Sequence, residues 1–199
     1  MRPSDNCTAF AGNEHIASGP LTEVAIRAKA VLDADQTARI LIFDAVTAEP
    51  IEVDFRGTPD DVLRRIGHHA ELSMQHASVA AGGRGRGRPR LGVVAREVTL
   101  LPRHWDWLGR QPGGASVVLR KLVEEARRSN GAKDVVREAR EVAYRFMSAM
   151  AGNEPDFEEA TRALFAGNKD SFDQAVAAWP PDIRDHATSL ADAGFAQQP

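Results

Sequence analysis

Cysteine is almost absent from this sequence: Cys7 is the single one among 199 residues. One cysteine excludes a disulfide within the chain and a zinc site built on two or more thiolates of one chain. Both absences are typical of a reducing cytoplasm, which is where we expect the protein. Cys7 also lacks a basic or histidine neighbour in sequence that would activate its thiol.

Long apolar runs are also missing. The first ten residues, MRPSDNCTAF, contain no apolar signal core, and no run approaches the roughly 18 residues that a membrane span needs. Hydrophobic residues still make up 43% of the chain, enough for a core. We therefore expect a soluble protein of one or two domains without a membrane partner.

Familiar catalytic motifs are absent. The sequence has no GxGxxG after a strand, no GxxxxGK[ST] and no GxSxG. Glu52 and Asp54 alternate with the apolar residues of an expected strand, and we do not expect them to form a catalytic carboxylate pair. Asp60 and Asp61 are better explained as charges at a helix start. We predict a protein that is not an enzyme, with no catalytic residues and no cofactor.

A histidine-rich stretch raises the question of a metal site. His68, His69, Glu71 and His76 are close in sequence. On a helix His69 and His76 share a face but lie two turns apart, and no HExxH spacing occurs. We predict no metal site here.

The fold class expected is α+β, beginning with an acidic N-terminal domain over residues 1–80. A hairpin signal at Gly12-Asn13 and a helix start at Thr58-Pro59 punctuate it. The expected strands cover residues 7–10, 15–17, 38–43 and 51–55, and the expected helices cover 21–34 and 58 to about 76 or 80. The order is ββαββα with an antiparallel sheet.

The C-terminal region, residues 131–199, predicts an acidic helical domain. Gly167-Asn168 and Pro180-Pro181 are expected to end helices. The expected helices cover residues 132–151, 156–166, 171–179 and 182–193. Short connections between them predict antiparallel packing as a bundle.

The charge is concentrated in the middle of the chain. Residues 84–128 contain eleven basic and four acidic residues, a net charge of +7, which leaves 14 basic and 24 acidic residues elsewhere, a net charge of −10. A basic block between acidic flanks points to a polyanionic partner, most simply DNA.

Residues 81–95 form a basic linker whose segment RGRGRPR resembles an AT-hook, a peptide that binds the DNA minor groove. The resemblance assigns DNA contact to six residues: Arg84, Arg86, Gly87, Arg88, Pro89 and Arg90. A backbone without Cβ at Gly87 fits a narrow A·T-rich groove, along which guanidinium groups can lie. The alternative is a plain flexible basic linker that touches RNA or an acidic partner.

Residues 96–130 resemble a ribbon-helix-helix repressor domain, which implies an obligate dimer. The ribbon would be residues 96–101, the first helix would open at Pro102, the turn would be residues 111–114, and the second helix would cover 115–128. The resemblance assigns DNA contact to Arg96 and Thr99 of the ribbon and to Gly114 and Ser116 at the second helix N-terminus. A helix-turn-helix relative or a purely structural segment are the alternatives.

The ribbon departs from the usual pattern. One alternation exposes Arg96 with two apolar residues, and the other exposes Thr99 with Glu97, which repels phosphate. Neither gives three base-reading side chains, so the ribbon is expected to serve dimerisation. Trp105 and Trp107 are two residues apart, so a helix cannot bury both on one face. We expect both to pack in a dimer core; the alternatives are that one of them stacks on a partner or lies under the C-terminal helices.

Most of the chain is also similar to an uncharacterised bacterial family of about this length. The similarity rests on TAFAG, LIFDA, GRPRLGVVAREVTLLPRHWDWL, PGGAS and YRFMSAMAG. It implies a bacterial cytoplasmic protein whose segments belong together, and it brings no activity with it.

These observations predict a bacterial DNA-binding protein, a homodimeric transcriptional regulator that contacts A·T-rich DNA. The flanking domains would sense a small effector, bind a partner or enlarge the dimer interface. The alternative is a non-enzymatic interaction protein, antitoxin-like or an adaptor, whose basic segment docks an acidic partner.

Overall fold

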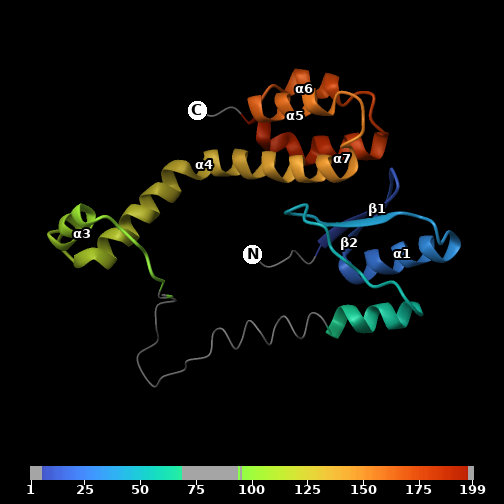
Figure 1. Cartoon of the computed structure of the whole chain (residues 1–199), viewed down its shortest axis with the longest axis horizontal. Coiled ribbons are helices and arrows are strands. Elements are labelled where there is room, and N and C mark those ends of the chain that lie inside the picture. Colours follow the sequence, from blue (N-terminus) through green and yellow to red (C-terminus); the bar gives the residue numbers. More distant parts are fainter. Residues whose placement is uncertain (1–5, 69–93, 95, 197–199) are drawn as a thin grey trace. The chain divides into compact units, whose positions relative to one another are not determined.

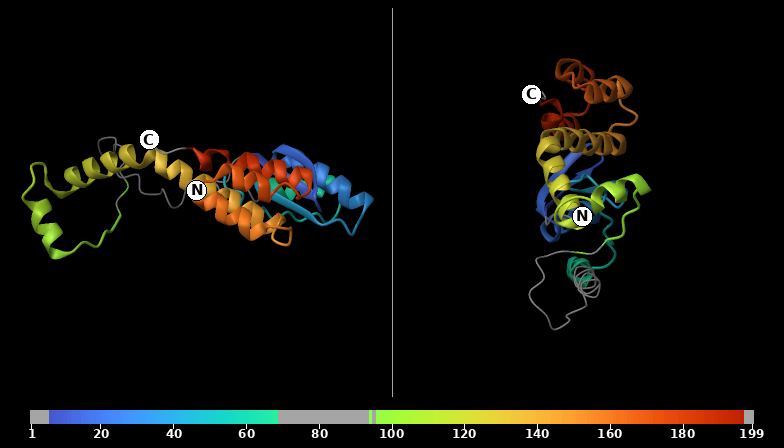
Figure 2. Two further views of the ribbon diagram at one scale, coloured as in Figure 1. Left: turned by 90° about the horizontal axis from the view of Figure 1, so that it is seen from above. Right: turned by 90° about the vertical axis from the view of Figure 1, so that its left-hand side faces the viewer.

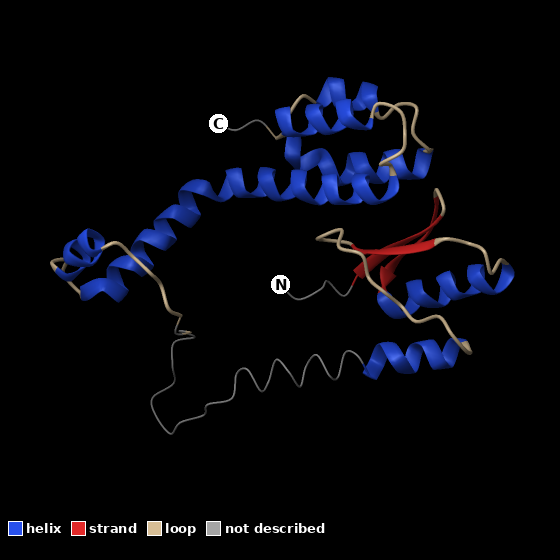
Figure 3. Cartoon of the chain, in the orientation of Figure 1, coloured by secondary structure: helices blue, strands red, loops and turns tan. Residues whose placement is uncertain are grey.

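A computed structural model describes residues 6–68, 94 and 96–196 of the chain. It contains two compact units: unit 1 is Met1–Ala77 with Lys133–Pro199, and unit 2 is Ser78–Ala132. The expected α+β class is confirmed, since an antiparallel sheet of three strands occurs together with several helices (Figure 3). The sequence predicts separate domains over residues 1–80 and 131–199, whereas in the structure these two segments build unit 1 together.

The sheet of unit 1 forms from strands β1 (Asn6–Ala11), β2 (Glu14–Pro20) and β3 (Ile40–Asp44) in the order β2-β1-β3. Both pairings are antiparallel, with Thr8 opposite Ser18 on one side and Phe43 on the other. The predicted turn at Gly12-Asn13 joins β1 to β2. Helix α1 (Leu21–Ala34) follows β2 directly and has the predicted bounds.

The two faces of this sheet bury different partners, as period-two alternation along a strand requires. Cys7 and Ala9 of β1 face α1 and pack with its Val24 and Ala28. Phe10, which follows Ala9 in β1 and so lies on the opposite face, packs against residues from the C-terminal half of the chain. The sheet is therefore a middle layer (Figure 1).

The second face is covered by helices from residues 133–196. They are the C-terminal part of α4 (Gly114–Met150), α5 (Phe157–Ala166), α6 (Lys169–Ala175), α7 (Pro181–Ala191) and the short 3₁₀ helix η1 (Asp192–Phe195). Phe146 of α4 lies with its ring centroid 5.4 Å from that of Phe10 and 5.3 Å from that of Phe43. Figure 2 shows these orange and red helices stacked over the blue strands. One core thus joins the two ends of the chain.

The predicted strand at residues 51–55 is wrong, so the observed order of this region is ββαβα. Ile51 donates its amide to Ile42 (2.8 Å), and the chain then leaves the ladder. The guanidinium of Arg65 binds the backbone carbonyls of Asp54, at 2.9 Å, and of Arg56. The Arg65 side chain thus occupies backbone carbonyls that a neighbouring strand would need as acceptors. The apolar side chains of Ile51, Val53 and Phe55 still pack against the core that includes α1.

The predicted helix start at Thr58-Pro59 is confirmed: residues 59–68 are helical. The Asp61 amide donates to the Thr58 hydroxyl at 3.3 Å, and the Thr58 amide donates to the Asp61 carboxylate at 2.9 Å. This is a capping box with aspartate in place of glutamate. The predicted end of the helix lies outside the described residues.

The predicted break before residue 132 is wrong, because α4 runs without interruption from Gly114 to Met150. A glycine inside a helix costs about 1 kcal/mol relative to alanine, which weakens a helix without stopping it. The remaining helices agree with the prediction to within a few residues, and Asn168 caps α6 by accepting from the Ser171 amide at 3.1 Å. None of the helices in the described part of the chain has the length and apolarity needed to cross a bilayer.

Candidate nucleic-acid interface

Two helices and a glycine turn form the described part of unit 2. Helix α3 (Pro102–Gly109) opens at Pro102 as predicted, and residues 110–113 turn the chain into α4. Gly113 and Gly114 have φ of +90° and +75°, a left-handed conformation that glycine adopts without a Cβ clash. The adjacent glycines therefore allow the turn that the sequence predicts at residues 111–114.

The predicted ribbon, residues 96–101, contains no strand within the single chain. Arg96 and Thr99, the two side chains expected to contact DNA, are exposed. Val98 and Leu101 are also 55% and 50% exposed. A ribbon of this kind needs a second chain to pair with, so the ribbon and the homodimer stay predictions.

The expected phosphate clamp at the start of α4 is in part already occupied. The Gly114 amide donates to the Gln111 carbonyl at 3.2 Å, inside the turn. Ser116 is exposed, and its carbonyl accepts a hydrogen bond from the Arg120 guanidinium at 3.1 Å. The Ser116 hydroxyl thus remains the candidate phosphate donor of this pair.

Every described basic side chain of residues 96–128 is exposed: Arg96, Arg103, Arg110, Arg120, Lys121, Arg127 and Arg128. Within the described part of unit 2, the structure pairs one of these seven with a carboxylate, Arg127 with Glu124 at 3.6 Å. The positive charge of this region is therefore directed to solvent and largely unneutralised.

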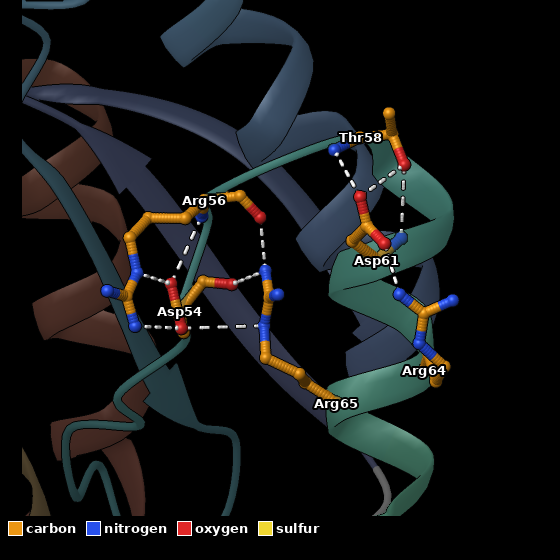
Figure 4. Close-up of polar contacts among 6 residues, drawn as sticks. All are labelled: Asp54, Arg56, Thr58, Asp61, Arg64 and Arg65. Atoms are coloured by element: carbon orange, nitrogen blue, oxygen red, sulfur yellow. Dashed lines mark hydrogen bonds and ion pairs between the residues drawn. The ribbon is translucent and has the colours of Figure 1, made fainter.

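In unit 1, a cluster of three arginines pairs with carboxylates, as Figure 4 shows. The Asp54 carboxylate accepts from the Arg56 amide (3.1 Å), Nε (2.9 Å) and Nη2 (2.7 Å), and it lies 3.5 Å from Nε of Arg65. Arg64 pairs with Asp61 on the neighbouring helix turn. The hydrogen bonds from Arg56, followed by its charge and that of Arg65, lower the pKa of Asp54. These arginines anchor residues 51–58 and are already neutralised.

Arg84, Arg86, Gly87, Arg88, Pro89 and Arg90 lie outside the described residues. Their assignment to DNA therefore stays a prediction from the sequence.

Sequence reasoning did not assign the arginines that flank the second tryptophan of α3. Trp107 is 47% exposed, and Arg103 and Arg110 lie four residues before and three residues after it. Residues at these spacings share one face of a helix. The spacing was visible in the sequence, but the exposure of the indole was not.

Unit 1 holds a contact between a histidine ring and a serine hydroxyl. Nε2 of His15 lies 2.8 Å from the Ser18 hydroxyl, which in turn lies 3.0 Å from the Thr8 hydroxyl. A nucleophile and its base meet at such distances. However, the Asp182 carboxylate accepts from the backbone amide of His15 (2.7 Å) and not from its ring. The ring thus lacks the orienting carboxylate of a catalytic triad among the described contacts.

Two other candidate sites in unit 1, a buried thiol and an acidic groove, do not indicate a reactive centre. Burial, and then the charge of Asp44, raise the pKa of the Cys7 thiol to about 11, so it is unreactive at neutral pH. A groove of about 460 Å³ between α6 and α7 includes Asp173 and Asp192, which both pair with Lys169. No three His, Cys, Asp or Glu residues gather as a metal site in residues 6–68 and 96–196. Of the predicted histidine stretch, His68 is described and exposed, and the others lie outside.

Comparison with known proteins identifies the chain at the level of a family. No curated protein and no solved structure matches it. Residues 6–191 match the family described as "Uncharacterized protein conserved in bacteria (DUF2239)". This match spans both units, as the sequence similarity implied, and the chain belongs to that bacterial family.

Proposed function

We propose that this protein binds DNA through the basic middle of its chain. The observation that carries the proposal is the exposed, unneutralised charge of unit 2, in which six of the seven described basic side chains have no carboxylate partner among the described ion pairs. In unit 1, by contrast, Arg56, Arg64 and Arg65 pair with Asp54 or Asp61. A polyanion that releases its counterions is the natural ligand for such a surface.

The proposed division of labour follows the chain. The arginine–glycine segment from Arg84 to Arg90 lies along an A·T-rich minor groove. Arg96, Thr99 and Ser116 contact the backbone and fix the register. Unit 1, in which the two ends of the chain share a core, bears on regulation or partner binding. The homodimer and a role as a transcriptional regulator belong to the same proposal.

A gel-shift series tests the proposal. The full-length protein is titrated against A·T-rich, G·C-rich and random duplexes at 50 and 200 mM salt. If six or more phosphates are contacted, affinity falls by about 10³-fold or more between the two concentrations. The A·T-rich duplex is expected to bind most tightly.

The double variant Arg86→Ala/Arg88→Ala is expected to lose binding to the A·T-rich duplex. Its matched control is Arg137→Ala/Arg162→Ala, which removes the same charge from side chains that are 59% and 66% exposed in unit 1. Equal losses of affinity in both double variants would show that binding depends on the net charge of the protein and not on Arg86 and Arg88. Weak, salt-insensitive duplex binding by the wild type would overturn the proposal and favour an acidic protein partner.

A further inference from the structure

We infer that the face of α3 formed by Arg103, Trp107 and Arg110 is a stacking site for an unpaired nucleotide, so that single-stranded nucleic acid is a ligand of unit 2. The inference rests on the proposed function, which gives nucleic acid as the class of ligand. It deepens that proposal by naming single-stranded nucleic acid as a further ligand. Every residue of the site lies within the described part of the chain.

The sequence spacing places these three side chains together. Trp107 follows Arg103 by four residues and precedes Arg110 by three, the separations at which helical side chains are neighbours. Arg110 is the C-cap residue, and its φ of −86° and ψ of −7° continue the helical course. The face that carries the indole thus also carries an arginine one turn before it and another one turn after it.

The exposure of the three residues shows that the face is open. Trp107 is 47% exposed, and both arginines are exposed. Neither arginine pairs with a carboxylate among the described ion pairs, although Nε of Arg110 donates to the Asp106 carbonyl at 3.1 Å. That contact uses one donor of a guanidinium that carries five, so most of its donors and its charge stay available.

The other tryptophan of α3 lies on a different face. Trp105 is 43% exposed and follows Leu101 by four residues and precedes Leu108 by three. Leu108 is 2% exposed, so this second face is the apolar one. The helix therefore separates an indole among apolar residues from an indole among arginines.

An indole between two cations matches the chemistry of a nucleotide. An aromatic ring stacks on the face of a base, and the arginines meet the phosphates on either side. In a duplex the base faces are covered by their neighbours, whereas in a single strand they are open. The pairing of one stacking ring with flanking positive charge therefore favours an unpaired strand over a duplex or an apolar partner.

Tryptophan fluorescence tests this inference on the full-length protein. The probe is a single-stranded oligo-dT, with a hairpin duplex of equal charge as the comparison. Trp179 supplies a constant background, because it is 2% exposed and its indole donates to the Pro155 carbonyl at 2.8 Å. Oligo-dT is expected to quench the wild-type emission, and Trp107→Ala is expected to abolish most of the quenching.

The affinity of Trp107→Ala for oligo-dT should fall about 5- to 150-fold, the loss expected for one stacked base. Trp107→Tyr should restore most of it, and Trp105→Ala should bind as the wild type does. Circular dichroism verifies that each variant is folded, and the Tyr variant decides the case if the Ala variant is not.

The outcomes separate the two proposals. Suppose that the wild type binds duplex, and that Trp107→Ala and Trp107→Tyr bind oligo-dT with the wild-type affinity. The stacking site is then wrong, and the DNA-binding proposal stands. If the wild type binds neither duplex nor oligo-dT, both are wrong. Loss of a dimer in Trp107→Ala, measured by light scattering, with unchanged nucleic-acid affinity would instead assign this face to a second copy of the chain.

Discussion

His186 of α7 is a half-buried histidine among phenylalanine rings. Its ring centroid lies 4.6 Å from that of Phe146 and 5.5 Å from that of Phe10. Burial, and then the nearby His15, lower the pKa of His186 below its usual value of 6.5. The folded protein therefore holds this side chain neutral at pH values where the unfolded chain begins to protonate it.

The sign of the pH dependence follows from that difference. As the pH falls below about 6.5, the unfolded state binds a proton first, so the free energy of unfolding decreases until the folded state is also protonated. One proton limits the slope to about 1.4 kcal/mol per pH unit. Above the usual pKa this histidine has no effect on the pH dependence of stability.

Urea unfolding at pH 8, 7, 6 and 5.5 measures this effect. The wild type should lose stability between pH 7 and 5.5, and His186→Gln, which cannot titrate there, should lose less. His68→Gln is the control, since His68 is exposed, and it should keep the wild-type slope. Identical slopes in all three proteins would show that His186 does not govern this pH range. Asp54 and Asp61 do not interfere, because their lowered pKa values place their titration at lower pH.

Environments of this kind could not be predicted from the sequence, because they depend on residues far apart in the chain. His186 meets Phe10, and Arg145 of α4 donates to the Thr47 carbonyl in the loop after β3. No local pattern connects such residues. The same reason explains why Trp107 could be placed on a helix by its spacing, while its exposure had to come from the structure.

At the scale of elements, local signals were predictive where they were strong. The fourteen residues of α1 follow an apolar stripe and were predicted to the residue. The cap of the helix at residues 59–68 was predicted from Thr58 and Pro59. Two predictions failed for different reasons. Residues 51–55 alternate like a strand, but Arg65 binds the carbonyls of Asp54 and Arg56. Helix α4 continues through Gly131, because a single glycine weakens a helix without stopping it.

The continuity of α4 gives a prediction at Gly131. A Cβ added there meets no atom within 4 Å, and its φ is not left-handed. Gly131→Ala should therefore stabilise the helix by about 0.5–1 kcal/mol, and Gly131→Pro should cost about 3 kcal/mol by breaking it. Thermal unfolding and the helical circular dichroism signal at low temperature measure both effects.

A second glycine serves as the opposite control. Gly167 ends α5 with a φ of +74°, and a Cβ there would lie 2.6 Å from Nη2 of Arg140. Gly167→Ala should be destabilising by about 1–2 kcal/mol, since alanine is strained in the left-handed region.

If Gly131→Pro left the helical signal unchanged, α4 would be two helices, as the sequence suggested.

At the scale of the whole molecule, the sequence suggested an acidic domain at each end, separated by a basic middle. That charge distribution is correct for the sequence, but it gives no sign that the two ends of the chain share one core. Phe10 and Phe43 need covering on the sheet face opposite α1, and the helices of residues 133–196 supply that cover. A three-stranded sheet whose one face is covered by α1 needs a further layer to bury its other face.

This shared core predicts that residues 1–80 do not fold in isolation. The fragment should lack near-ultraviolet dichroism and cooperative unfolding, because its apolar sheet face is left in water. Mixing it with a fragment of residues 96–199 should restore a cooperative transition. A cooperatively folded 1–80 fragment would show that the helices are dispensable to the sheet.

A point substitution measures the same interface in the intact chain. Phe146 is fully buried between the sheet and α7, so Phe146→Ala should lower the free energy of unfolding by about 3–5 kcal/mol, the usual cost of such a cavity. Phe165→Ala is the matched control, because Phe165 is 47% exposed and contacts Tyr144 at the surface; it should cost less than about 1 kcal/mol. The described residues of this core all belong to unit 1. Phe146→Ala should therefore lower the urea midpoint of unit 1, whereas nucleic-acid binding by the folded variant should be unchanged. Similar losses in both phenylalanine variants would contradict a core shared by the two ends of the chain.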